Sequence, residues 1–136
     1  QIFDSEGNFI STFGSKGNGN GRFSCPEGIC TDKNDRIYVC DYGNNRIQIF
    51  DSQGKFISTF GSEGNGNDQF HNPYGICVDK NDNIIVCDFG NNRVQIFNSN
   101  GEYVTQFKVI QPIGITIDSN TQNVIVTRYD NQVSIF

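Results

Sequence analysis

The chain reads Arg46-Ile47-Gln48-Ile49-Phe50-Asp51 before its centre, and further on it reads Arg93-Val94-Gln95-Ile96-Phe97-Asn98. Shorter versions of this motif stand at Gln1-Ile2-Phe3-Asp4 and at Gln132-Val133-Ser134-Ile135-Phe136. The four equivalent phenylalanines are spaced by 47, 47 and 39 residues. A motif that recurs at such a period is the signature of repeat architectures, in which one structural unit is copied along the chain.

A second motif keeps the same spacing. It has the form Pro-x-Gly-Ile and begins at Pro26, Pro73 and Pro112. The last interval is shorter because Lys108–Gln111 stands where the preceding repeat has the Gly- and Asn-rich loop Gly61–Asn72. We therefore expect one domain, residues 1–136, built from three repeat units of approximately 4–50, 51–97 and 98–136.

Each repeat contains four short strand signals separated by turn-forming residues. In the middle repeat the strands are expected at 75–78, 84–87, 93–97 and 102–107, and the segments between them are rich in Asn, Asp and Gly. No window shows a helical period of apolar residues. Four antiparallel strands in a repeat of about 40 to 50 residues are typical of a β-propeller blade. The sequence predicts an all-β protein with about three propeller blades, either a partial propeller or half of a six-bladed one.

Three motifs in these repeats resemble the NHL repeat. They are Pro-x-Gly-Ile, Ile-x-Val-x-Asp as in Ile37–Asp41, and Asn-x-Arg-Ile-Gln-x-Phe as in Asn44–Phe50. The loops at 13–19 and 60–66 read Phe-Gly-Ser-x-Gly-Asn-Gly and are similar to those in the C-terminal propeller of animal tripartite-motif (TRIM-NHL) proteins. This resemblance implies a module that recognises protein substrates or RNA for a ubiquitin ligase. No RING or B-box motif is present, so these residues themselves are not expected to have ligase activity.

The third repeat departs from the pattern at three places. Arg128 stands where the other repeats have Asp41 and Asp88, and Gln132 replaces their arginine. The segment Tyr129-Asp130-Asn131 replaces a Gly-Asn-Asn turn. Two explanations are open: the repeat has drifted, or its loop has been recruited for binding.

Composition restricts the partners. The 136 residues carry a net charge of −5, which argues against a broad nucleic-acid footprint but leaves room for a local basic patch. No apolar run is long enough to span a membrane. We expect a protein partner, with RNA as the alternative, and no membrane partner.

Five cysteines are present, and four of them form two equivalent pairs of positions. Cys30 with Cys77, and Cys40 with Cys87, occur inside apolar runs, so all four are predicted to be buried, unpaired core residues. Cys25 leaves the count odd, which fits poorly with a disulfide framework. No Cys-x-x-Cys pair exists, and no metal or cofactor is expected. The thiols and the lack of a glycosylation sequon favour a cytoplasmic location, with an extracellular sensor propeller as an alternative.

Propeller topology distributes the connections over two faces. We define the long-loop face as the connections from strand four to strand one and from strand two to strand three, and the short-turn face as the remaining turns. On this assignment the short-turn face, with Lys33 and Lys80, carries all the net negative charge, and the long-loop face is electrically balanced. Because function concentrates on loops held by a rigid scaffold, the long-loop face is the predicted binding surface.

The candidate binding residues are aromatic or basic side chains of the long-loop face, as is usual for protein interfaces. They are His71, Tyr74, Arg128, Tyr129, Tyr42 and Phe89. Tyr74 and Tyr129 depart from their repeat pattern and are the stronger candidates, with Arg128 beside them and His71, in a flexible loop, near by. For Tyr42 and Phe89, packing between blades is the competing explanation.

Acidic residues and their arginine partners recur with the repeat. Asp41 with Arg46, and Asp88 with Arg93, are predicted to be structural pairs, worth about 0–1 kcal/mol each if they are exposed. The chain has a single histidine and no Gly-x-Ser-x-Gly motif, so no catalytic residue is assigned and the module is expected to be non-enzymatic.

Three repeats are fewer than the four to eight blades, roughly, of a closed propeller. We therefore expect either a fragment of a longer chain or a head-to-tail homodimer. In the dimer, residues 8–13 of one copy would complete the last blade of the other.

Overall fold

The computed structural model describes all residues from Gln1 to Phe136 and is built from strands, tight turns and two short 3-10 helices. Two antiparallel sheets have four strands each, in sequence order. Blade A consists of β5 (Pro26–Thr31), β6 (Ile37–Asp41), β7 (Arg46–Phe50) and β8 (Phe56–Phe60). Blade B consists of β11 (Pro73–Val78), β12 (Ile84–Asp88), β13 (Arg93–Phe97) and β14 (Tyr103–Lys108). The all-β propeller architecture predicted from the repeats is confirmed.

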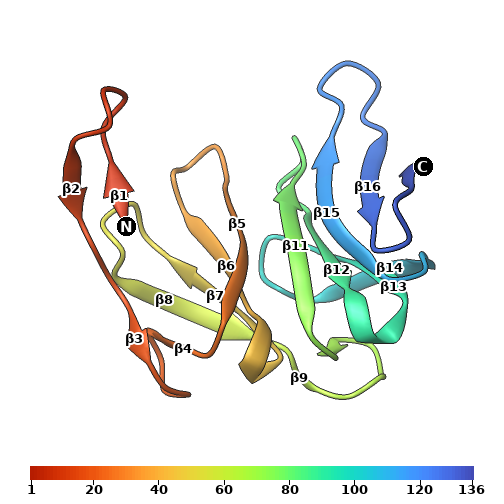
Figure 1. The fold of residues 1–136 in the computed structure, drawn as a ribbon, viewed down its shortest axis with the longest axis horizontal. Helices are drawn as coiled ribbons and strands as arrows, with labels where there is room; N and C mark the ends of the chain where they lie inside the picture. Colours follow the sequence, from red (N-terminus) through yellow and green to blue (C-terminus); the bar gives the residue numbers. More distant parts are fainter.

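Two smaller sheets flank these blades. Blade C has three strands, β15 (Pro112–Ile117), β16 (Val124–Arg128) and β17 (Val133–Ile135). At the other end, β1 (Ile2–Phe3) pairs with β2 (Phe9–Ser11) in an antiparallel hairpin. The β2 strand, expected to complete the last blade of a second copy, is thus paired within its own chain, and Figure 1 shows this hairpin at the opposite side of the molecule from β16.

The first strands of the three blades lie side by side, so that β11 contacts both β5 and β15 (Figure 1). The glycine of the Pro-x-Gly-Ile motif makes this close approach feasible. A Cβ on Gly28 would lie 2.2 Å from the Tyr74 carbonyl oxygen, and one on Gly75 would lie 2.3 Å from that of Ile113. Because a backbone atom cannot move away as a side chain can, these positions require glycine.

The core lies between the blades. Its largest cluster joins blades A and B and includes Tyr38, Ile47, Phe70 and Phe97. A second cluster, around Val94 and Val126, joins blades B and C. Strands β6 and β12 are buried at every residue because both faces of each sheet are covered, and this explains why their sequences are continuous apolar runs rather than alternating ones.

A cluster of phenylalanines repeats in the core. Phe50 packs against Phe13 and Phe23, with ring centroids 4.9 and 5.6 Å apart. In blade B, Phe97 packs in the same way against Phe60 and Phe70, at 4.9 and 5.5 Å. One ring of each trio, Phe13 or Phe60, lies at or just after the outer strand of the preceding sheet. Another, Phe23 or Phe70, lies in the long loop before the blade. The equivalent Phe136 of blade C has a single such partner, Phe107, at 4.8 Å.

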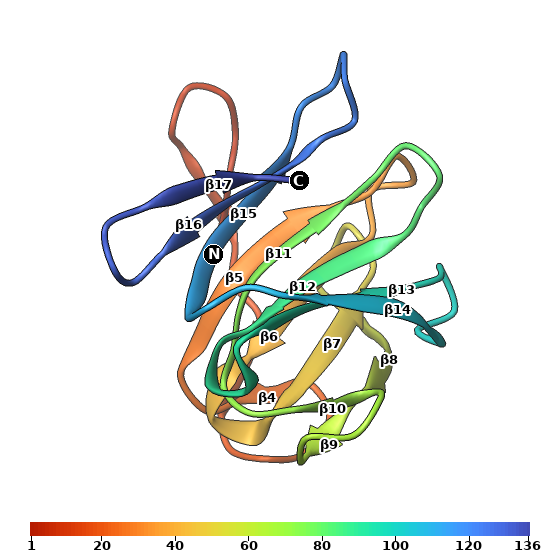
Figure 2. The same ribbon diagram turned by 90° about the vertical axis from the view of Figure 1, so that its right-hand side faces the viewer.

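The long loops contain short parallel pairs that the sequence did not predict. Within 14–25, β3 (Ser15–Lys16) pairs with β4 (Arg22–Phe23), and within 61–72, β9 (Ser62–Glu63) pairs with β10 (Gln69–Phe70). Figure 2 shows β9 and β10 at the end of the molecule opposite the tips of the β5–β6 and β15–β16 hairpins. The long loops and the short turns therefore occupy opposite faces, as the repeat topology predicts.

The cysteine predictions are partly confirmed. All five thiols are free, Cys40 and Cys87 are completely buried, and Cys25 is exposed. The prediction of full burial is wrong for Cys30 and Cys77, which are half-buried because they lie on the first strands of their blades, β5 and β11. Desolvation still raises the pKa of each of these two thiols to about 12.

Candidate functional site

A buried carboxylate holds the long-loop face of blade A together. Asp41 ends β6 and is inaccessible to solvent. Its oxygens accept hydrogen bonds from the Ser24 backbone N–H and from the side chains of Asn44, Arg46 and Gln48, at 2.8 to 3.0 Å. These donors belong to the long loop, to the 3-10 helix η1 (Tyr42–Asn44) and to β7, so one side chain connects three segments.

Blade B repeats the same arrangement. Asp88 is buried and accepts from the His71 backbone N–H at 2.8 Å and from Asn91 and Arg93 at 2.8 and 2.7 Å. Asn91 belongs to the second 3-10 helix, η2 (Phe89–Asn91). The guanidinium of Arg93 also donates to three carbonyls of the long loop, those of Asn65, Gly66 and Gln69. The loop of blade B is thereby fixed to its sheet.

Both expected acid–arginine pairs form, and in both the carboxylate is buried rather than exposed. Arg46 Nε lies 2.8 Å from Asp41 Oδ2, and Arg93 Nε lies 2.7 Å from Asp88 Oδ2, with neither carboxylate side chain accessible. The small stabilisation of an exposed ion pair, about 0–1 kcal/mol, therefore does not apply to these two pairs. Removing one partner from a buried pair costs about 3–5 kcal/mol because the other charge is left uncompensated.

Blade C reverses the polarity of this site. Arg128 occupies the position of Asp41 and Asp88, since it pairs in register with Pro112 as they do with Pro26 and Pro73. Its Nε donates to the Ile110 carbonyl at 3.2 Å, and its Nη2 lies 2.5 Å from Asp130. At this position blades A and B therefore have a carboxylate that accepts a hydrogen bond from a backbone N–H, whereas blade C has a guanidinium that donates one to a backbone carbonyl.

Four aromatic side chains form a continuous row across the long-loop face, which we call the aromatic row. It runs Tyr42–Tyr74–Phe89–Tyr129, with neighbouring ring centroids 5.8, 6.1 and 6.2 Å apart. Tyr129 is 67% exposed, and the other three are half-buried. The row therefore spans all three blades and presents ring surface to solvent.

The register of the strands explains the row. Tyr42, Phe89 and Tyr129 each follow the last residue of the second strand of a blade, and Tyr74 is the second residue of β11. Tyr129 is predicted above to depart from the repeat, because the segment 129–131 is aligned with a Gly-Asn-Asn turn. That prediction is wrong, since Tyr129 follows the second strand of its blade just as Tyr42 and Phe89 do. Tyr74 does differ from its equivalents, which are Glu27 and Ile113. Sequence reasoning found all four rings but not their contacts, since these are made between blades.

An acidic residue stands at the Tyr42 end of the row. Glu27 of blade A, which is equivalent to Tyr74, is exposed. Its negative charge raises the pKa of the Tyr74 phenol above the ordinary 10.0, and partial desolvation adds to this effect. Ring faces and a carboxylate are thus placed together on one surface.

His71 does not belong to the aromatic row. Its backbone is fixed by Asp88 and by a 2.7 Å hydrogen bond from the Gly90 N–H to its carbonyl, so the expectation of a flexible loop is not met at this residue. A Cβ on Gly90 would lie 2.6 Å from the His71 ring. The exposed imidazole lines a separate hollow of about 270 Å³ with Glu63, Gly64, Asn65 and Asn91.

No group of three or more His, Cys, Asp or Glu side chains converges in the way that metal ligands do. The structure contains no helix whose length and apolar character would let it cross a bilayer.

The comparisons with known proteins agree with the architecture. A family model described as DUF5128, 6-bladed beta-propeller, matches residues 26–111. Protein lin-41 of Caenorhabditis elegans is 49% identical over 39 residues, an alignment that covers 29% of this chain and 3% of that protein.

Solved structures share the fold at low identity. A luciferin-regenerating enzyme superposes with a TM-score of 0.62 at 17% identity, over 82% of this chain and 40% of its own. The calcium-binding protein regucalcin of Agrobacterium tumefaciens gives 0.62 at 19%, over 77% and 38%. A protein of Bacteroides fragilis gives 0.67 at 14%, over 90% and 40%. The chain thus spans about two fifths of these structures. Because the family model covers more than half of the chain, this protein belongs to the 6-bladed beta-propeller family DUF5128.

Proposed function

We propose that this chain is a non-enzymatic module that binds a protein partner through the long-loop face. The observation that carries the proposal is the aromatic row, four rings in contact across three blades. Large, half-exposed aromatic side chains are the usual energetic centres of protein interfaces. The buried networks around Asp41 and Asp88 fix the loops beneath the row, so little ordering entropy is lost when a partner binds.

We further propose that the propeller is of the NHL type and serves as the recognition module of a TRIM-NHL-like ubiquitin ligase. The motifs Ile37–Asp41 and Asn44–Phe50 support this assignment, together with the Phe-Gly-Ser-x-Gly-Asn-Gly loops. The free thiols of the core support a reducing, cytoplasmic setting for the module.

RNA binding is the second candidate, because exposed rings also stack nucleic-acid bases. Lys16 and Arg22 are exposed on the long-loop face and provide positive charge there. Against this candidate, acidic residues such as Glu27 and Glu63 balance that charge, and phosphate recognition depends on a basic surface.

A pull-down from cells under native conditions tests the proposal. Wild type, the double variant Tyr74→Ala/Tyr129→Ala and the short-turn-face variant Lys33→Ala/Lys80→Ala are compared by quantitative mass spectrometry. We expect a protein that is retained by wild type and by the lysine variant and lost from the tyrosine variant. Retention of the same proteins by the tyrosine variant would contradict the proposal.

A salt titration with a single-stranded RNA separates the second candidate from the first. Phosphate contacts make the logarithm of the affinity fall with the logarithm of the salt concentration, by roughly 0.7 per contact for single strands. We expect weak binding without a steep slope. Tight binding with a slope of several phosphate contacts, lost in the tyrosine variant, would assign the aromatic row to RNA.

A further inference from the structure

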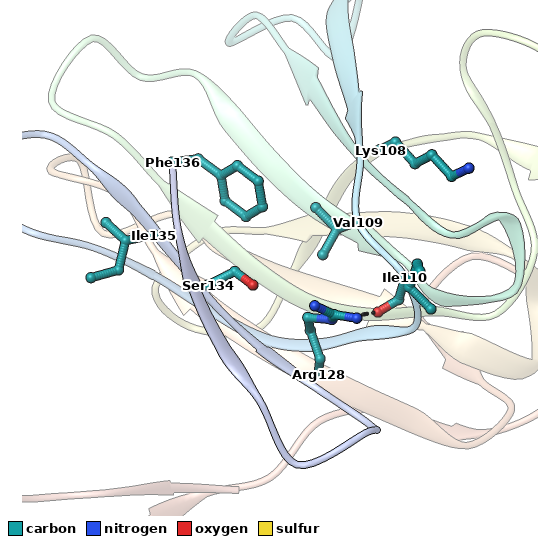
Figure 3. Close-up of a pocket in the computed structure, with 7 residues that line it drawn as sticks. All are labelled: Lys108, Val109, Ile110, Arg128, Ser134, Ile135 and Phe136. Atoms are coloured by element: carbon teal, nitrogen blue, oxygen red, sulfur yellow. Dashed lines mark hydrogen bonds between the residues drawn. The ribbon is translucent and has the colours of Figure 1, made fainter.

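The two ends of the aromatic row differ in charge. At the Tyr129 end, Arg128 is paired with Asp130, and its Nε donates to the Ile110 carbonyl at 3.2 Å (Figure 3). At the Tyr42 end stands Glu27, which is exposed and has no lysine or arginine within salt-bridge distance. The row therefore has one end where the charges are paired and one end with a free carboxylate.

The backbone fixes Glu27 beside the first two rings of the row. Pro26, the residue before it, pairs in register with the residue that precedes Tyr42. Gly28, the residue after it, lies so close to β11 that a Cβ there would be 2.2 Å from the Tyr74 carbonyl oxygen. Glu27 is thus placed between the two segments that carry Tyr42 and Tyr74, and its charge raises the pKa of the Tyr74 phenol.

Tyr42 and Tyr74 leave ring surface for a cation. Their rings meet edge to face with the planes at 85°, so the contact covers at most one face of one ring. Both side chains are half-buried, which restricts their motion but leaves them accessible. An arginine guanidinium is planar, stacks on aromatic faces and pairs with carboxylates, so it matches both the rings and the free carboxylate of this corner.

The spacing of the rings fits an extended chain. Neighbouring ring centroids from Tyr42 through Tyr74 to Phe89 are 5.8 and 6.1 Å apart. In an extended polypeptide, the side chains on one side recur at every second residue, or about every 6.5 Å. Alternate side chains of an extended segment can therefore meet successive rings. A nucleic-acid backbone is a poorer occupant, because Glu27 would repel its phosphates.

We infer that the Tyr42 end of the aromatic row binds an arginine from an extended segment of the partner polypeptide, with an apolar side chain two residues away on Phe89. The guanidinium stacks on the rings of Tyr42 and Tyr74 and pairs with Glu27. This inference rests on the proposed binding role of the aromatic row and adds the chemistry that the partner presents to it.

Synthetic peptides probe the site directly. The first is Ser-Arg-Ser-Leu-Ser-Leu-Ser with both ends blocked, and the second replaces its arginine by citrulline, which has nearly the same shape without the charge. The third, Ser-Arg-Leu-Leu-Ser-Ser-Ser, has the same composition without the alternation. Each is titrated into the isotope-labelled 136-residue chain, and amide shifts are followed by NMR.

We expect the first peptide to shift the amides of Glu27 and Tyr74. It should bind about tenfold more tightly than the citrulline peptide, because both the stacking of the cation and the ion pair are lost with the charge. It should also bind more tightly than the third peptide, whose leucines cannot follow the spacing of the rings.

Two charge reversals on the same face locate the arginine site. Glu27→Lys should weaken the arginine peptide by about tenfold or more, because a like charge now faces the guanidinium, and should leave the citrulline peptide unchanged. Glu63→Lys makes the same change at another exposed position and should alter binding by less than about twofold, since salt screens distant charges. If circular dichroism shows that Glu27→Lys does not fold, Glu27→Gln serves instead, with an expected weakening of about fivefold.

Three results would overturn the inference: no tighter binding of the arginine peptide than of the citrulline peptide, no tighter binding than that of the third peptide, and equal effects of the two charge reversals. The cellular pull-down separates the inference from the proposed function. A protein that is lost from the Tyr74→Ala/Tyr129→Ala variant but fully retained by Glu27→Lys would contradict the arginine site and leave the proposed function standing. If the tyrosine variant loses no protein, both fail.

Discussion

At the scale of single residues, the last residue of the second strand decides how the segment before each blade is held. This residue is Asp41, Asp88 or Arg128. The recurrence of aspartate with arginine predicted the ion pairs in blades A and B. It did not predict that the carboxylates are buried, because the backbone donors come from 17 residues upstream, in loops whose path the sequence does not reveal.

The pKa of the Tyr74 phenol depends on the charge beside it on the long-loop face. Since the charge of Glu27 raises its pKa, we expect Glu27→Gln to lower that pKa toward 10.0. Glu63→Gln, on the long loop, serves as the control and should not change it. Ultraviolet titration of tyrosinate formation, with Tyr74→Phe to assign the transition, measures the shift. An identical Tyr74 titration in wild type and Glu27→Gln would show that this carboxylate does not act on the ring.

The cysteines should react in order of exposure. Cys25 is expected to be alkylated first, because it is exposed. Cys30 and Cys77 should follow slowly, since burial raises their pKa to about 12 and the thiolate is the reactive form. Cys40 and Cys87 should react only on unfolding, because they are completely buried. Mass spectrometry after timed iodoacetamide treatment measures each site, and rapid labelling of Cys40 or Cys87 in the native protein would be inconsistent with this core.

At the scale of elements, the strands were easier to predict than the loops. The segment 93–97 was predicted with the bounds that β13 has, because apolar residues and flanking turns mark both of its ends. The parallel pair β9–β10 was missed, since two-residue strands in a Gly- and Asn-rich loop have no apolar pattern. Their positions depend on hydrogen bonds from Arg93 and Gln95, which lie 24 or more residues away.

The loop of blade B depends on Asp88. We expect Asp88→Asn to destabilise the protein by about 3–5 kcal/mol, because it leaves the buried guanidinium of Arg93 without its counter-charge. The exposed Glu6→Gln serves as the control and should change the free energy of unfolding by less than about 0.5 kcal/mol. Urea unfolding followed by circular dichroism gives both values. A loss below about 1 kcal/mol for Asp88→Asn would show that the network contributes little.

Asp32, in the turn between β5 and β6, should make the free energy of unfolding depend on pH in the acid range. Burial raises the pKa of Asp32, but hydrogen bonds from Arg36, Asn34 and Tyr38 outweigh that effect and place it below the ordinary 3.8. A group whose pKa is lowered by folding stabilises the protein above its unfolded pKa, and this contribution is lost as pH falls through the folded value.

We therefore expect the contribution of Asp32 to be complete near pH 7 and to decline below about pH 4. Asp32→Asn should lower the unfolding free energy at pH 7 and lower it less at pH 3. Urea midpoints of wild type and variant at both pH values test this. An equal difference at the two values would contradict a lowered pKa.

At the scale of the whole molecule, the propeller fold could be predicted because each repeat carries its own strand pattern. The meeting of Tyr42, Tyr74, Phe89 and Tyr129 could not, since it depends on how blades pack side by side. The short connection between blades B and C, by contrast, could be predicted from the interval of 39 residues.

The most direct test of the central claim is the affinity of the partner that the module retains. By isothermal titration calorimetry, Arg128→Ala/Tyr129→Ala and Tyr74→Ala should each weaken binding by about 1–3 kcal/mol while the circular dichroism spectrum is unchanged. The short-turn-face variant Lys33→Ala/Lys80→Ala should bind within about 0.5 kcal/mol of wild type. If the lysine variant loses more affinity than the long-loop variants, the partner binds the other face and the account of the aromatic row is wrong.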